Sequence, residues 1–145
     1  MLIFILLALG SCDNNGSDGS IEIELLTKNQ NGQAVNEFAL GENISFELTL
    51  RNKTKNDYVM NFADGGQFGF HVLNDARSHV WLWGADINVI AAFTQIIVRP
   101  DDLVQKTIVW DQMLSNGENI PPGRYIVEGA FKDQSPKMEA SFIIK

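Results

Sequence analysis

The sequence is poor in cysteine and in basic residues, and it lacks a long apolar run. Its single cysteine among 145 residues excludes a disulfide framework and any zinc finger. Eleven basic residues against 18 acidic ones give a net charge of −7, which argues against nucleic-acid binding because phosphate contacts need a basic face. No apolar run reaches the roughly 20 residues that span a bilayer. What remains is one small domain, long enough to fold without metal or disulfides.

The first twelve residues carry an export signal. Residues 1–9 form an uninterrupted apolar run followed by small residues, which is typical of the core of a signal peptide. Leu9-Gly10-Ser11-Cys12 resembles the lipobox of bacterial lipoproteins, in which the peptide is cut before the cysteine and the thiol is diacylated. The resemblance implies a signal peptide over residues 1–11, a lipidated Cys12, and a flexible tether over residues 12–20. It places the protein in the bacterial cell envelope, held to a membrane through the lipid anchor only.

One usual part of an export signal is missing, which leaves two alternatives open. No lysine or arginine precedes the apolar run, although export signals normally begin with a basic stretch. The alternatives are a plain secretory signal with an incidental cysteine, and a wrongly placed start site on a cytoplasmic protein. We prefer the lipoprotein because Cys12, the only cysteine, occupies the one position that a lipobox requires.

After residue 20 the apolar residues recur with period two, which is the period of a half-buried strand. The runs with this pattern are 21–25, 44–50, 58–62, 68–72, 80–83, 94–99, 104–110, 125–131 and 138–144. Turn residues such as Asn31-Gly32, Asn116-Gly117 and Pro121-Pro122-Gly123 separate these runs. The best helical candidate, residues 85–93, is short. We therefore predict an all-β fold, an Ig-like antiparallel β-sandwich of seven to nine strands in one domain over residues 21–145.

Three stretches of this domain form a recognisable set. The first is residues 66–72. The second is Val80-Trp81-Leu82-Trp83, followed after a loop by Phe93-Thr94-Gln95. The third is Trp110-Asp111-Gln112, followed by Asn116-Gly117 and residues 122–129. Together they resemble the intracellular proteinase inhibitor family called BsuPI. Gly69 and Gly84 depart from the family pattern, which has Asp and usually Ser at these positions. The resemblance implies an Ig-like β-sandwich that binds and inhibits a serine protease.

The export signal changes the partner that this resemblance implies. An exported chain does not meet a cytoplasmic protease, so we expect an extracytoplasmic serine protease or another envelope protein. The candidate contact loop is residues 84–92, between two strong strand runs, with Ile87, Asn88, Val89 and Ile90 at its centre. Its apolar side chains are costly to leave in water, so they are either packed or used in binding. The alternatives are a short helix folded over the end of the sandwich, and a structural or adhesive lipoprotein that holds proteins or glycans without inhibiting a protease.

Four aromatic residues have a structural interpretation. Trp81 and Trp83 lie two positions apart on one predicted strand, so they share a face. We interpret them, with Trp110, as core anchors, and the alternative is an aromatic platform for sugars. Tyr125 follows Pro121-Pro122-Gly123 and resembles a tyrosine corner, whose hydroxyl bonds to nearby backbone.

The sequence offers little for catalysis or metal binding. His71 and His79 are the only histidines, and a structural zinc site needs four ligands. No Gly-x-Ser-x-Gly elbow, His-Glu-x-x-His pair or phosphate loop is present. We interpret Asp101, Asp102 and Asp111 as solvated turn carboxylates rather than calcium ligands. We therefore expect no catalytic residues, no metal and no cofactor, and we predict that the protein is not an enzyme.

Overall fold

A computed structural model describes residues 19–84 and 88–145, and these residues form ten β-strands. The strands are β1 (Ile21–Lys28), β2 (Glu37–Phe38), β3 (Ile44–Asn52), β4 (Tyr58–Phe62), β5 (Phe68–Asn74), β6 (His79–Leu82), β7 (Thr94–Val98), β8 (Leu103–Trp110), β9 (Gly123–Phe131) and β10 (Met138–Ile144). Each of the nine expected runs is a strand, with ends within three residues of those expected. The all-β prediction is confirmed. The additional strand, β2, has two residues and is too short to show an alternating pattern.

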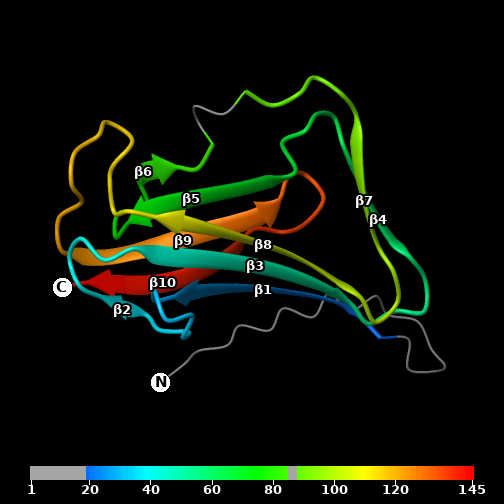
Figure 1. The fold of residues 1–145 in the computed structure, drawn as a ribbon, viewed down its shortest axis with the longest axis horizontal. Coiled ribbons are helices and arrows are strands. Elements are labelled where there is room, and N and C mark those ends of the chain that lie inside the picture. The colour runs from blue at the N-terminus through cyan, green and yellow to red at the C-terminus, as the bar shows by residue number, and fades with distance from the viewer. Residues whose placement is uncertain (1–18, 85–87) are drawn as a thin grey trace.

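Two sheets and a two-stranded ribbon make up the sandwich (Figure 1). One sheet has the order β1-β3-β8 and the other has the order β2-β10-β9-β5-β6, while β4 and β7 pair only with each other. Neighbouring strands are antiparallel except β10 and β2, which run parallel. In Figure 1 the ribbon rises at one end of the molecule, across the direction of the other strands.

The core lies between the inner faces of the sheets and follows the expected alternation. On β9, for example, Tyr125, Val127 and Phe131 are buried at every second position, and the residues between them are partly exposed. An aromatic cluster fills part of the core, where the Phe46 ring lies 6.0 Å from that of Trp110 and 5.8 Å from that of Phe142. Rings at these separations stabilise one another beyond the effect of their burial.

The β4–β7 ribbon is fixed to the sandwich at its base by Asn52, the last residue of β3. This side chain is fully buried. Its Nδ2 donates hydrogen bonds to the carbonyl oxygens of Val98, at 2.8 Å, and Asn56, at 2.7 Å. Its Oδ1 accepts from the backbone N–H of Thr54 at 2.9 Å. One amide thus ties the end of β3 to the end of β7 and to the turn that leads into β4.

The structure differs from one expectation about the candidate loop. Residues 88–93 are irregular, so the alternative of a short helix is not seen in this part of the segment. The rest of that segment, Ala85, Asp86 and Ile87, lies outside the described residues, as do Cys12 and residues 1–18 as a whole. Within residues 19–84 and 88–145, no helix is long and apolar enough to cross a bilayer.

Candidate functional site

The described part of the candidate loop is held against the turn at residues 64–66. The N–H of Gly65 donates a hydrogen bond to the carbonyl oxygen of Ile90 at 3.0 Å. Four residues later, the hydroxyl of Thr94 donates to the carbonyl oxygen of Asp64 at 2.7 Å. The loop is therefore fastened at two points before it enters β7.

The close approach of the loop to this turn depends on glycine. A Cβ atom added at Gly65 would lie 2.7 Å from Cγ1 of Ile90, a separation that real side chains do not reach. At Gly66 an added Cβ would make only an ordinary contact with Cγ1 of Val89, at 3.4 Å. Because Gly65 has no side chain, the backbone of Ile90 and the inner parts of the Val89 and Ile90 side chains rest directly on the turn.

Those side chains extend an exposed apolar surface along the ribbon. Val89 is 46% exposed and Ile90 is 65% exposed, and Phe93, directly before β7, is 70% exposed. Farther along the ribbon, Val59 and Ile97 are exposed cross-strand partners on its outer face. We call these five residues the ribbon surface. Single exposed apolar side chains are common on folded proteins, whereas several gathered on one surface are typical of sites that bind another protein.

Two of the three predicted core tryptophans, Trp81 and Trp110, lie together at the aromatic cluster. Trp110 is 1% exposed, and its ring lies 5.6 Å from that of Trp81. Trp83 lies just after β6 and meets the ring of Phe70 edge-on at 6.1 Å. Trp81 and Trp83 are half-buried and pack against the core, so they do not present two free faces to a sugar.

Tyr125 has the geometry of a tyrosine corner. Its hydroxyl donates a 2.6 Å hydrogen bond to the carbonyl oxygen of Pro121, four residues earlier. Burial raises the pKa of Tyr125, which keeps the hydroxyl protonated and able to donate. The residue therefore fixes the turn that leads into β9.

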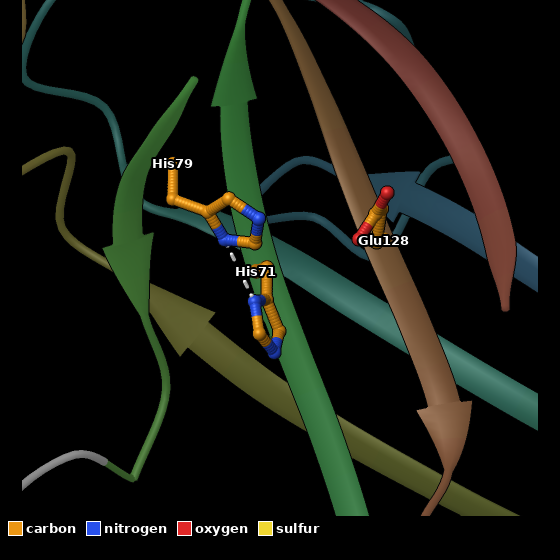
Figure 2. Close-up of side chains that lie close together, drawn as sticks. All are labelled: His71, His79 and Glu128. Atoms are coloured by element: carbon orange, nitrogen blue, oxygen red, sulfur yellow. Dashed lines mark hydrogen bonds between the residues drawn. The ribbon is translucent and has the colours of Figure 1, made fainter. Parts of the chain in front are cut away.

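A second group of side chains, which sequence reasoning did not bring together, lies on the outer face of the five-stranded sheet. Figure 2 shows His71 on β5, His79 on β6 and Glu128 on β9. The Nδ1 atoms of the two histidines are 2.9 Å apart, and one ligand atom from each of the three residues lies within 4.8 Å of the others. Burial and the neighbouring His79 lower the pKa of His71, while the Glu128 carboxylate acts in the opposite direction. These are residue types that bind metal ions.

The sequence contained only a partial signal for this group. His71 and Glu128 occupy outward positions of their strands, and in the structure they are direct partners in the β5–β9 ladder. Alternation predicts the outward direction of each side chain, but it does not predict which strands are neighbours or in which register.

Comparison with solved structures gives only distant similarity. A β-glucosidase from Listeria innocua in complex with isofagomine matches 87% of this chain at 14% identity, with a TM-score of 0.46. A β-glucosidase from Erythrobacter marinus matches 87% of this chain at 9% identity, with a TM-score of 0.48. The alkylpurine DNA glycosylase AlkC from Pseudomonas fluorescens, bound to DNA, matches 85% of this chain at 12% identity, with a TM-score of 0.48. The chain spans 16% of the length of each β-glucosidase and 30% of that of the glycosylase. Similarity at this level does not extend to function. No curated protein matches the chain significantly.

The family comparison agrees with the resemblance noted in the sequence. The profile of the BsuPI family, described as intracellular proteinase inhibitor, matches residues 33–136. The match runs from before β2 to the turn after β9, so it includes both the ribbon and most of the five-stranded sheet. It covers more than two thirds of the sequence, and the chain belongs to the BsuPI intracellular proteinase inhibitor family.

Proposed function

We propose that the protein is an exported, lipid-anchored β-sandwich that binds a serine protease outside the cytoplasm and inhibits it through residues 84–92. Membership of the BsuPI proteinase inhibitor family is the observation that carries this proposal. The lipobox ending at Cys12 supports the location, and it replaces the intracellular target of the family description with an extracytoplasmic one.

The fastening of the loop supports its role as the inhibitory segment. A protein that occupies a protease cleft presents an extended segment, and ordering that segment during binding weakens the affinity. Here the hydrogen bonds to Ile90 and from Thr94 fix the loop to the turn at residues 64–66 in the free protein. The side chains of Val89 and Ile90 remain exposed, so they are available to apolar subsites of a protease.

The remaining residues of the ribbon surface supply a second area of contact. Val59 and Ile97 lie on the ribbon and Phe93 lies directly before it. Gln95 and Asn61 are cross-strand partners between them. The side chains of these two polar residues are joined by a 2.7 Å hydrogen bond from Gln95 to Asn61. A mixture of apolar side chains with a few polar ones is typical of protein interfaces.

A second candidate function, protein binding without inhibition, is favoured by strand β8. This eight-residue strand is an edge of the three-stranded sheet, and its Leu103 and Val109 are exposed. An exposed edge can accept a strand from another protein. A structural or adhesive lipoprotein would use this edge in place of the loop.

The inhibition hypothesis predicts the effect of changing the loop. The purified full-length protein should inhibit a subtilisin-like protease with one-to-one stoichiometry. Replacement of Ile87, Val89 and Ile90 together by serine should weaken inhibition at least about 100-fold, since burial of each aliphatic side chain contributes roughly 1.5–3 kcal/mol and each 1.4 kcal/mol is a factor of ten. Inhibition constants measured for both proteins test this, and circular dichroism should show an unchanged fold.

A matched variant controls for the loss of apolar surface. Leu40, just after β2, and Val109, on β8, are also exposed, and both lie outside the ribbon surface. Their joint replacement by serine should leave inhibition unchanged. If a panel of serine proteases keeps full activity with an excess of the wild-type protein, the inhibition hypothesis is wrong and the non-inhibitory alternative stands.

The lipid anchor is tested separately at Cys12. In bacterial cells the wild-type protein should incorporate labelled palmitate, and Cys12→Ala should incorporate none, because the thiol is the site of diacylation in a lipoprotein. Mass spectrometry of the wild-type protein should place the mature N-terminus at Cys12. Equal labelling of the two proteins would contradict the lipoprotein assignment while leaving the inhibition experiment unaffected.

A further inference from the structure

His79 reaches His71 because β6 contains a bulge. The β5–β6 register passes from the pair Val72–Trp81 to the pair Leu73–His79, so β6 holds one additional residue, Val80, at this point. In a regular ladder Val80 would face Leu73, and His79 would point toward the core. The additional residue turns His79 to the outer face of the sheet, on the side of His71. Bulges are frequent next to functional sites, where they redirect a side chain.

Glu128 has an oxygen atom without a hydrogen-bond donor. Its side chain is 12% exposed, and its buried Oε2 accepts no hydrogen bond from any residue that the structure describes. The cations that face it stay beyond hydrogen-bond distance, with Arg77 at 3.7 Å from Oε1 and Lys137 at 3.8 Å from Oε2. The guanidinium of Arg77 is bonded instead to Glu139. A buried carboxylate oxygen in this state is suited to a bound cation, since buried polar atoms are normally satisfied.

We propose that His71, His79 and Glu128 form a binding site for a divalent transition-metal ion, with Zn²⁺ as the probe. The three residues come from three neighbouring strands, β6, β5 and β9, so the sheet itself sets their spacing. The site is separate from the ribbon surface, and it does not depend on protease inhibition.

The donor set determines the class of metal. Two imidazoles and one carboxylate suit Zn²⁺, Cu²⁺, Ni²⁺ or Co²⁺, whereas Ca²⁺ and Mg²⁺ prefer oxygen ligands alone. Zn–N bonds of about 2.0–2.1 Å place neighbouring ligands of a tetrahedral ion about 3.3–3.4 Å apart. The 2.9 Å between the two Nδ1 atoms is close to that spacing. All the ligand atoms lie within 4.8 Å of one another, so the most distant pair has to approach by at most about 1.5 Å. Three protein ligands leave the fourth position of the ion to water or to another molecule.

Neighbouring charges oppose one another at the site. Arg77 and Lys137 face Glu128 and repel a cation, while Glu139, the cross-strand partner of Glu128, attracts one. Glu139 is bonded to Arg77 and is not part of the three-residue group. It therefore provides a matched control, because its replacement removes the same charge from the same face without removing a ligand.

The test measures Zn²⁺ affinity by competition with a chromophoric chelator. The full chain carries Cys12→Ser in every sample, because a free thiol is itself a zinc ligand. We expect saturable binding of one Zn²⁺ per chain. His79→Gln and Glu128→Gln should each weaken binding at least about tenfold, since the loss of even a residue that supports a ligand weakens metal binding roughly 10–100-fold. Glu139→Gln should change the affinity by less than about threefold.

A second readout separates ligation from a general effect on folding. Co²⁺ in place of Zn²⁺ should give the visible absorption of a four-coordinate site in the parent protein and in Glu139→Gln, and this absorption should be lost in His79→Gln. His79 is exposed, so this variant keeps the fold, which circular dichroism verifies. Absence of saturable Zn²⁺ binding, or equal weakening by Glu128→Gln and Glu139→Gln, would overturn the proposal.

Discussion

Replacement of Trp110 by alanine should lower the free energy of unfolding by about 3–5 kcal/mol, which is the usual cost of removing a large buried aromatic side chain. Trp110 is 1% exposed, and its ring contacts those of Phe46, Trp81 and Phe142 at centroid distances of 5.6–6.2 Å. Its Nε1 also donates a 2.9 Å hydrogen bond to the carbonyl oxygen of Met113. The variant would leave both a cavity between the sheets and an unpaired carbonyl. Urea unfolding followed by far-UV circular dichroism measures the difference.

Trp110→Phe serves as the control for this effect. Phenylalanine keeps an aromatic ring in the core and loses the hydrogen bond to Met113, so the expected loss is smaller, about 1–2 kcal/mol. The order of stability should therefore be wild type, then Trp110→Phe, then Trp110→Ala. An alanine variant as stable as the wild type would contradict the position of Trp110 between the two sheets.

The strands were predictable because burial follows the alternation of residue types directly. In β3, Ile44, Phe46, Leu48 and Leu50 are fully buried, and the polar residues between them lie on the other face. Thr49 is an exception among these polar positions, because it is buried and accepts a hydrogen bond from Gln105 of β8. The pattern specifies where a strand lies and which face is apolar, even where such local details vary.

Pairing between strands could not be predicted from the same pattern. Strand β2 has two residues, and it exists because Glu37 and Phe38 pair with the end of β10 while the Phe38 ring meets that of Phe142 at 6.0 Å. The meeting of His71 and His79 likewise depends on one additional residue in β6. Both features arise from contacts between segments distant in the sequence, which local periodicity does not report.

The candidate loop was ambiguous for a different reason. Its apolar residues fitted both a short helix and an exposed extended segment, because a run of this length has too few turns to define a period. In the structure, Gly65 leaves room for the backbone and the side chain of Ile90 to rest on the turn beneath them. The conformation is therefore decided by a turn more than 20 residues earlier, where the sequence showed only a break between strands.

Replacement of Asn52 by alanine should lower the free energy of unfolding by about 2–4 kcal/mol. The side chain is fully buried, and the change leaves the carbonyl oxygen of Val98 and the N–H of Thr54 without their partner, while the carbonyl oxygen of Asn56 still accepts from the hydroxyl of Thr54. Each buried polar group without a partner costs about 1–3 kcal/mol, and relaxation of the turn recovers part of the sum. Urea unfolding measures the global loss. The rate of amide hydrogen exchange should increase most in β4 and β7, because Asn52 joins the ribbon to β3.

Two further variants show whether the buried amide itself is responsible. Asn61 lies on the exposed outer face of β4, where its side chain accepts a hydrogen bond from Gln95 and its backbone N–H donates to Gln134. Alanine keeps the backbone bond, so Asn61→Ala should change stability by less than about 0.5 kcal/mol. Asn52→Asp keeps the size of the side chain and the acceptor for Thr54, but it places a carboxylate against two carbonyl oxygens. It should therefore destabilise at least as much as alanine, since an unpaired buried charge is costlier than a missing amide. If Asn52→Asp is as stable as the wild type, the two donated hydrogen bonds do not hold the ribbon, and the attachment must depend on the backbone bonds between Asn52 and residues 101 and 102.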